Sequence, residues 1–182
     1  EVLESEIEAV KDDVVIEPLI SEEVVLKGSK VKKVAQNEAM GTTEWTLKNG
    51  VKVVLKQTDY EADRIRLSAI SDGGTALFCD GCYWTAQLLS SVMSESGISK
   101  FSASDLRKQL SGKVASANTS VDMYEHAVMG QASLKDVETM LQLVYLQFTT
   151  PRFDQTDFDN FMTRISSMLA NQETNPDFIF SQ

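Results

Sequence analysis

The feature that most constrains the fold of this sequence is an Asn-Gly dipeptide between two short runs that alternate apolar and polar residues. It lies in TEWTLKNGVKVVLKQT, residues 43–58. Asn49-Gly50 favours a type I′ turn, because both central residues of that turn need positive φ. The second run places Val51, Val53 and Leu55 on one side. We therefore predict a β-hairpin whose second arm has one buried face.

Three more strands are predicted from the same period of two. RIRLSAIS, residues 64–71, is the first, and it should also have one buried face. Its inward residues are expected to be Ile65, Leu67 and Ala69. KVASANTSVDMYEHAVMGQAS, residues 113–133, is interpreted as two further strands. Their inward candidates are Tyr124, Ala127 and Met129.

Two helices are predicted between these strands. Residues 83–96 carry an apolar stripe at helical spacing, and Gly97 can end that helix. The stripe consists of Trp84, Leu88 and Val92, with Leu89 and Met93 beside them. A shorter helix follows Ser102, which can cap it, with Asp105 near the positive end of the dipole and Gly112 after its last turn. Its buried side is expected to be Leu106 and Leu110.

Two longer helices are predicted near the C-terminus. The first runs from about residue 134 and stops at Pro151. Its stripe is Val137, Leu141, Val144, Tyr145 and Phe148. The second starts at Asp154, with the stripe Phe158, Phe161, Ile165, Met168 and Leu169. The order β-β-β-α-α-β-β-α-α predicts an α+β fold, with helices packed on one face of a mainly antiparallel sheet.

Residues 1–40 differ from the rest and are interpreted as an acidic linker that precedes a domain at 41–182. Residues 1–13 are acidic and weakly helical, and VVIEPLISEEVVLKGSKVKKV, residues 14–34, has no sustained period. A disordered acidic tail is the alternative. The apolar residues at 14–16, with Val24 and Val25, suggest that parts of this segment dock on another surface.

Composition excludes several classes of protein. The 182 residues are 42% apolar and 8% aromatic, enough for a real core, and the formal charge of −10 argues against a nucleic-acid partner. No run approaches the roughly 18 apolar residues of a membrane span. Because the chain lacks an initial Met and stops soon after Pro176 without a closing element, we expect it to be a fragment of a longer chain.

The two cysteines form the pair Cys79-Asp80-Gly81-Cys82 just before the predicted helix at 83–96. A redox pair, a local disulfide, a zinc site and plain loop cysteines are all open interpretations. The surroundings lack the βαβ context of a thioredoxin-like motif, and Asp80 disfavours a thiolate. Zinc would need two further ligands, and the chain offers only His126 and carboxylates.

Other candidate residues have simpler structural interpretations. His126 is the single histidine and is expected to be a half-exposed strand residue. Asp72-Gly73-Gly74 lacks the G-x-x-x-x-G-K phosphate loop and is interpreted as a turn. A nucleophilic serine would need a G-x-S-x-G elbow and a base. Because the sequence lacks that motif and has a single histidine to serve as base, we interpret four serines as the polar face of the helix: Ser90, Ser91, Ser94 and Ser96.

Three segments together resemble the second half of a pitrilysin/insulinase-type zinc peptidase, an inverted zincin, most closely the large zinc proteases of Bacteroides-like bacteria. These are TEWTLKNGVKVVLKQTDYEADRIRLSAISDGGTALF, LLSSVMSESGISKFSASDLRKQLSGKVAS and VETMLQLVYLQFTTPRFD. The resemblance covers about residues 41–182. It implies a metallopeptidase-half domain of the LuxS/mitochondrial-processing-peptidase type, and residues 14–34 resemble the acidic connector between the two halves.

The resemblance also implies where chemistry should be sought. In this family the motif H-x-x-E-H lies on the helix after the third strand, where two imidazoles bind zinc and the glutamate is the general base. The equivalent helix here, residues 83–96, has no histidine, and its one acidic residue is Glu95. We therefore expect no catalytic, cofactor-binding or metal-binding residue in this chain, with zinc held by the first half of the parent.

The function implied is that of a non-catalytic, substrate-enclosing domain in a two-half metallopeptidase that degrades peptides or unfolded proteins. The alternative is a catalytically empty scaffold or protein-binding module. The expected partners are the other domains of the parent and a peptide in the closed chamber, with self-association of the isolated chain through an apolar patch. The resemblance implies a periplasmic or secreted location.

Overall fold

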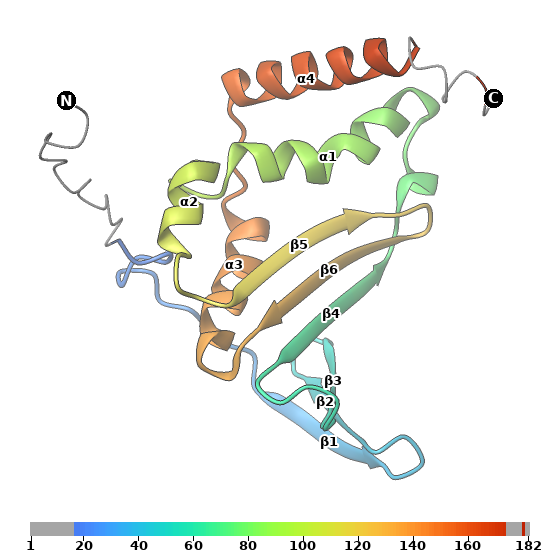
Figure 1. Ribbon diagram of the computed structural model, residues 1–182. Coiled ribbons are helices and arrows are strands. Elements are labelled where there is room, and N and C mark those ends of the chain that lie inside the picture. The colour runs from blue at the N-terminus through green and yellow to red at the C-terminus, as the bar shows by residue number, and fades with distance from the viewer. Residues whose placement is uncertain (1–16, 174–179, 181–182) are drawn as a thin grey trace, which may run out of the picture. The chain divides into compact units, whose positions relative to one another are not determined.

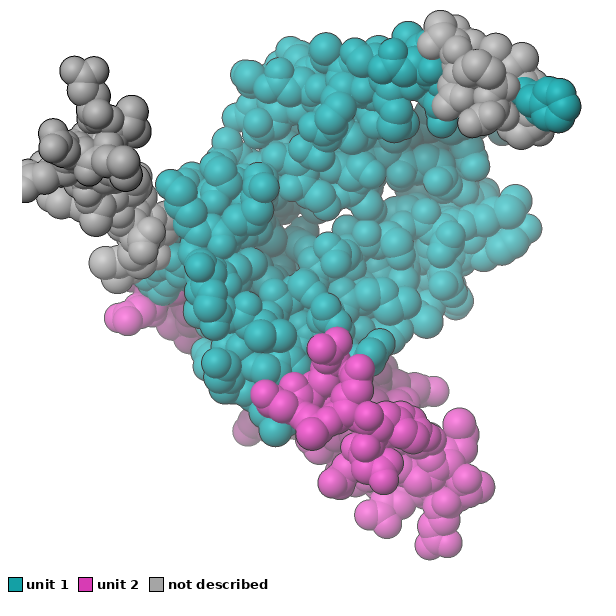
Figure 2. Space-filling view, in the orientation of Figure 1, with its two compact units in different colours: residues 1–19, 65–182 teal, residues 20–64 magenta. Residues whose placement is uncertain are grey.

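The computed structural model describes residues 17–173 and 180, and these form two compact units (Figures 1 and 2). Unit 1 comprises residues 1–19 and 65–182, and unit 2 comprises residues 20–64. Each unit has its own three-stranded antiparallel sheet. The predicted α+β class is confirmed.

Unit 2 is built on the predicted hairpin. Strands β2 (Thr42–Leu47) and β3 (Lys52–Lys56) pair antiparallel, with Trp45 opposite Val53. A further strand, β1 (Val31–Asn37), pairs with the other edge of β2, so the sheet order is β1-β2-β3. Of the face predicted to be buried, Val53 is half-buried, whereas Val51 and Leu55 are exposed.

The turn of this hairpin is not the predicted type I′. The Leu47 N–H donates to the Val51 carbonyl at 2.8 Å, and the Gly50 N–H donates to the Leu47 carbonyl at 3.0 Å. Only Gly50 of the pair has positive φ, at 92°. Asn49 instead uses its side chain, whose Oδ1 accepts from the Val51 N–H at 3.2 Å. This pattern is that of a three-residue turn with a glycine bulge.

The interpretation of residues 31–34 as linker is wrong, because they begin β1. The sequence did not indicate a strand here, because two adjacent lysines interrupt the alternation of apolar and polar residues in VKKVAQN. The expected boundary between residues 40 and 41 falls in the turn between β1 and β2, where the Gly41 N–H donates to the Glu38 carbonyl at 3.3 Å. The strand pairing of unit 2 therefore crosses that boundary.

Residues 17–19 dock on the rest of unit 1. Glu17 forms an ion pair with Lys100, and the Gln109 Nε2 donates to the Glu17 carbonyl at 2.7 Å. Leu19 is buried. Val24 and Val25 are exposed, which corrects the expectation that they dock. The predictions for residues 1–13 and 14–16 lie outside the described residues.

The sheet of unit 1 has the order β4-β6-β5. Its strands are β4 (Ile65–Asp72), β5 (Ala115–Val121) and β6 (Glu125–Ala132), which confirms the predicted strands. Ile65 lies opposite Ala132, and Leu67 lies opposite Gly130. A Cβ at Gly130 would lie only 3.0 Å from the Sδ of Met140. The face shared by Leu67 and Gly130 is therefore the one that a helix covers.

All four predicted helices form. They are α1 (Tyr83–Ser96), α2 (Ala103–Gln109), α3 (Val137–Thr149) and α4 (Gln155–Glu173). Short 3-10 turns occur at Thr75–Leu77, Asp80–Cys82 and Leu134–Asp136. Within unit 1, α1 and α3 pack against β5, and α4 packs against α1 (Figure 1). No helix in the described part of the chain is long and apolar enough to cross a membrane.

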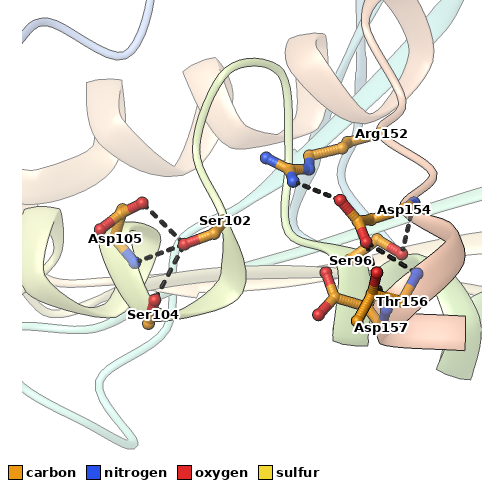
Figure 3. A network of polar contacts seen from close by, with 8 residues as sticks. All are labelled: Ser96, Ser102, Ser104, Asp105, Arg152, Asp154, Thr156 and Asp157. Atoms are coloured by element: carbon orange, nitrogen blue, oxygen red, sulfur yellow. Dashed lines mark hydrogen bonds and ion pairs between the residues drawn. The ribbon is translucent and has the colours of Figure 1, made fainter. Parts of the chain in front are cut away.

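The helix ends are fixed as the sequence predicts. Ser102 Oγ accepts from the Asp105 N–H at 3.2 Å, and Asp154 Oδ1 accepts from the Thr156 N–H at 3.0 Å (Figure 3). Gly97 ends α1 with φ of 85°, and a Cβ there would lie 2.3 Å from the Phe101 carbonyl oxygen. Only glycine fits that position without displacing backbone.

The prediction of which α3 residues face the core is wrong, because a different face of this helix is buried. Met140, Leu143 and Leu146 are buried, whereas Leu141, Tyr145 and Phe148 are exposed. The helix is apolar on both faces, so helical period alone could not select the buried one. Three other expected core residues, Trp84, Tyr124 and Met129, are also exposed, Trp84 by 72%. In α4, Phe161 is buried as predicted, whereas Met168 and Leu169 are about half exposed.

Candidate functional site

Helix α1 is the element that the resemblance matches to the zinc helix, and one of its faces is engaged in packing. Its single acidic residue, Glu95, forms an ion pair with Arg164 of α4 at 2.5 Å. Ala86 is buried, and Leu88 and Ser90 are half-buried. These contacts hold the helix against the sheet and α4, whereas Trp84 and Leu89 are exposed.

The residues that the structure describes do not fit a zinc site. A structural or catalytic zinc centre needs three or four His, Cys or carboxylate ligands. The chain has one histidine, and within residues 17–173 no group of three such side chains lies close enough to hold a metal. We therefore derive no step through zinc for this chain.

The serines of α1 are structural residues, and one of them differs from the prediction. Ser94 Oγ donates to the Ser90 carbonyl at 2.9 Å within the helix. Ser91 and Ser94 are exposed, as a polar face requires. Ser96 is fully buried, and its Oγ accepts from the Asp154 N–H at 3.3 Å. This contact joins the end of α1 to the start of α4.

Asp154 organises the polar network between these two helices (Figure 3). Its carboxylate accepts from the Asp157 N–H at 3.2 Å and forms an ion pair with Arg152 at 3.0 Å. The hydrogen bond from the Asp157 N–H, followed by the one from Arg152, holds the pKa of Asp154 below its ordinary value. The network keeps Asp154 charged at the N-terminus of α4, where the helix dipole favours a negative charge.

His126 lies at the start of β6 and has a structural contact. Its Nε2 accepts from the Gly74 N–H at 3.1 Å. A Cβ at Gly73 would lie 2.6 Å from the His126 ring, so glycine permits this approach. The backbone of Gly73 donates to the Tyr124 carbonyl at 3.0 Å. The Asp72–Gly74 segment is therefore not the predicted turn: Asp72 is the last residue of β4, and the Gly73 and Gly74 amides bond to Tyr124 and His126 beside it.

Cys79 and Cys82 form a disulfide in the loop between β4 and α1. The sequence left this pairing as one of several alternatives. Cys79 is exposed and Cys82 is half-buried. The neighbouring Leu77, Phe78, Tyr83 and Trp84 are all exposed apolar residues.

A large apolar groove lies between the helices and the sheet of unit 1 (Figure 2). Its volume is about 770 Å³, and β4, β5, β6, α1, the end of α3 and the segment after it line it. The exposed apolar side chains of its lining are Ile70, Phe78, Leu89, Phe148 and Phe153. The sequence did not indicate this groove, because Leu89 and Phe148 had the spacing of core residues.

Comparison with known proteins shows similarity to zinc proteases. A protein named zinc protease PQQL-like, from Arabidopsis thaliana, is 32% identical to this chain over 111 residues. In structure, the chain is similar to the ferredoxin protease FusC, solved in complex with Arabidopsis ferredoxin, with a TM-score of 0.73 and 21% identity over 95% of this chain. The chain is therefore similar to zinc proteases of the pitrilysin/insulinase type, in part of its sequence and in its fold.

A second solved member of this pitrilysin/insulinase-type group has a similar fold. It is the periplasmic protease PqqL from Escherichia coli, with a TM-score of 0.72 and 18% identity over 91% of this chain. A protease from Helicobacter pylori is similar with a TM-score of 0.53 and 16% identity over 81% of this chain, which is 33% of that protein. No protein-family model matches the sequence.

The chain spans only part of these pitrilysin/insulinase-type relatives. It covers 19% of FusC, 18% of PqqL and 9% of the Arabidopsis protein, whose match includes 61% of this chain. The similarity therefore extends over about one helix-and-sheet domain of a multi-domain protease.

Proposed function

We propose that this chain is a non-catalytic, substrate-enclosing domain of a larger zinc metallopeptidase that cleaves peptides or unfolded proteins. In this proposal, zinc, its bound water and the general base belong to another part of the parent protein. The present chain supplies part of the wall that surrounds the substrate, and the acidic N-terminal segment connects it to the other half.

One observation carries the proposal. Where the zinc proteases of this family have H-x-x-E-H, α1 has Ala86-Gln87-Leu88-Leu89-Ser90-Ser91. Two imidazoles are needed for that motif, and the single histidine of the chain contacts the Gly74 amide from β6. The fold is retained, whereas the residue types that the chemistry requires are not.

The apolar groove supports a role in contacting substrate. An unfolded peptide exposes the apolar side chains that a folded protein buries, and an apolar concave surface can shield them from water. Phe148 is 66% exposed at the rim, and Leu89 of α1 contributes to the lining. A surface of this kind suits many peptide sequences, because the hydrophobic effect is not directional.

We also propose a periplasmic or secreted location. The solved relative PqqL is periplasmic, and the Cys79–Cys82 disulfide is of the kind that persists in oxidising compartments.

The test compares the chain alone with the longer protein that contains it. A quenched fluorescent unfolded peptide is incubated with each, with zinc and with a chelator. We expect chelator-sensitive cleavage by the long protein and none by the chain. Cleavage by the chain alone, abolished by the chelator, would contradict the proposal. If the long protein also fails to cleave, the alternative of a catalytically empty scaffold is supported instead.

A charged substitution in the groove tests the enclosing role directly. In the long protein, Leu89→Asp should raise the KM for the peptide and leave bound zinc unchanged. Leu141→Asp is the matched control, because Leu141 is a similarly exposed leucine of α3 that is absent from the groove lining. An unchanged KM for L89D, or an equal rise for L141D, would count against a substrate-contacting groove.

A further inference from the structure

The Cys79–Cys82 disulfide lies at the start of a continuous helical segment. Cys79 is extended and precedes the 3-10 turn Asp80–Cys82, and α1 begins at the next residue, Tyr83. The Cys82 N–H donates to the Cys79 carbonyl at 2.8 Å and closes the turn. The two sulfurs therefore span the first turn of a helical segment that extends to Ser96.

The two cysteines differ in how easily a thiol can reach them. Cys79 is exposed and Cys82 is half-buried. A Cβ placed on Gly81, between them, would meet nothing within 4 Å, so the space beside the disulfide is open. Thiol–disulfide exchange requires an attacking thiolate to approach one sulfur in line with the S–S bond. Cys79 Sγ is the accessible target.

The leaving sulfur is that of Cys82, which ends the first turn of this helical segment. The N–H groups around it already have partners, because the Cys82 N–H donates to the Cys79 carbonyl and the Tyr83 N–H donates to the Asp80 carbonyl. Exposure, rather than stabilisation of charge, therefore distinguishes the two sulfurs.

Exposed apolar residues flank the disulfide on both sides in the sequence. We call Leu77, Phe78, Tyr83 and Trp84 the aromatic collar, and each is exposed to solvent. The rings of Tyr83 and Trp84 pack edge to face, with centroids 5.3 Å apart. Contiguous exposed apolar residues of this kind mark a site for another molecule. Because the collar flanks an exposed disulfide in the chain, the molecule that fits it is an extended polypeptide with apolar side chains and cysteines.

We propose that Cys79–Cys82 is a thiol–disulfide exchange site for cysteine-containing unfolded polypeptides. A polypeptide thiolate attacks Cys79 Sγ, a mixed disulfide forms, and Cys82 leaves as a thiolate. A second thiolate of the polypeptide then attacks its own sulfur in the mixed disulfide and releases Cys79. The polypeptide loses two electrons and two protons and gains one disulfide, and the chain gains the same electrons and protons as two thiols.

The experiment uses the purified chain and an unfolded, leucine-rich peptide with two reduced cysteines, followed by thiol alkylation and mass spectrometry. We expect the peptide to be oxidised as the chain is reduced. With the oxidised peptide as probe, Cys82→Ser should accumulate about tenfold more mixed disulfide than Cys79→Ser, because the exposed Cys79 thiolate can attack the peptide disulfide more readily than the half-buried Cys82 thiolate can.

The aromatic collar is tested separately. Trp84→Ala should slow exchange with the peptide about fivefold and leave exchange with dithiothreitol unchanged. Trp45→Ala is the matched control, because Trp45 is the other tryptophan and lies in unit 2. Circular dichroism checks that each variant folds. If the cysteine variants do not fold, the proposal is tested by the exchange rates of W84A and W45A with the peptide and with dithiothreitol.

Three results would overturn the proposal. The first is a wild-type disulfide that the peptide does not reduce. The second is an equal amount of mixed disulfide in C79S and C82S. The third is a W84A variant that is slowed equally with the peptide and with dithiothreitol.

Discussion

Ser133 Oγ donates a 2.7 Å hydrogen bond to Asp136 Oδ2, and both residues are buried. The same carboxylate oxygen accepts from the Val114 N–H at 2.9 Å. These two bonds, the one from Ser133 first, hold the pKa of Asp136 below its ordinary value of 3.8. Asp136 thereby ties the start of α3 to the residue that precedes β5.

The lowered pKa of Asp136 predicts acid sensitivity. A carboxyl whose pKa is lower in the folded state stabilises the fold fully above its unfolded pKa, and this contribution is lost as pH falls through the folded pKa. We expect Asp136→Asn to lower the urea midpoint at pH 7 and to reduce the fall in stability below about pH 4. Asp59→Asn, at an exposed residue of unit 2, is the control. Equal pH profiles for D136N and wild type would contradict the assignment.

The choice of face on α3 makes two neighbouring residues unequal. Met140 is 2% exposed and packs on Gly130, whereas Leu141 is 49% exposed. We expect Met140→Ala to reduce the free energy of unfolding by about 2 to 5 kcal/mol. Leu141→Ala should change it by less than about 1 kcal/mol. Urea denaturation of both variants measures the difference, and equal losses would mean that the buried face is misassigned.

Two glycines with positive φ differ in what surrounds them. Gly97 (φ 85°) faces the Phe101 carbonyl, whereas a Cβ at Gly112 (φ 76°) would meet nothing within 4 Å. Gly112→Ala should lower the free energy of unfolding by about 1 to 2 kcal/mol, which is the cost of placing a residue with a Cβ in the left-handed conformation. Gly97→Ala adds a backbone clash, so its loss should be clearly larger in thermal or urea unfolding. The reverse order would show that the α1 terminus relaxes around the added methyl group.

The cap of α2 predicts a rescue experiment. Ser102→Ala removes the acceptor for the Asp105 N–H and should cost about 1 kcal/mol of unfolding free energy. Ser102→Asn keeps a capping side chain, so its stability should stay close to that of the wild type. If both variants lose the same stability, the contact of Ser102 with Ser104 or with the Asp105 side chain matters more than the cap.

The open groove predicts dye binding and association of the isolated chain. Phe148→Ser should lower the fluorescence of a bound apolar dye and shift light scattering towards the monomer, because a rim residue of the apolar patch becomes polar. Tyr60→Ser removes an aromatic ring that is 84% exposed in unit 2 and serves as control. A wild-type chain that is strictly monomeric and binds little dye would contradict this expectation.

Elements with an unambiguous local signal could be predicted from the sequence. The hairpin around Asn49-Gly50 and the bounds of α1, from Tyr83 to Ser96, are where the patterns indicate. Both rest on interactions within a few residues, namely turn chemistry, helical period and a terminating glycine. Strand β1 was missed because its pairing with β2, rather than its own pattern, makes it a strand.

The faces of the elements were harder to predict than their existence. Trp84, Tyr145 and Phe148 fit apolar stripes but are exposed, since the stripe alone does not specify which neighbour covers it. The candidate site shows the same limit. That α1 lacks the zinc motif can be read from the letters, whereas the bonding of Cys79 with Cys82 depends on how the loop turns.

The strand order β4-β6-β5 has a consequence for how unit 1 folds. The central strand, β6, is the last of the three in the chain, and its last residue, Ala132, pairs with the first residue of β4, Ile65. During synthesis, β4 is made before its partner strand. Helices α1 and α2 and strand β5 are all made before β6, so β4 can pair with β6 only after these three elements. Such distant pairing slows folding. During this interval both edges of β4 lack a partner strand, which exposes the chain to aggregation.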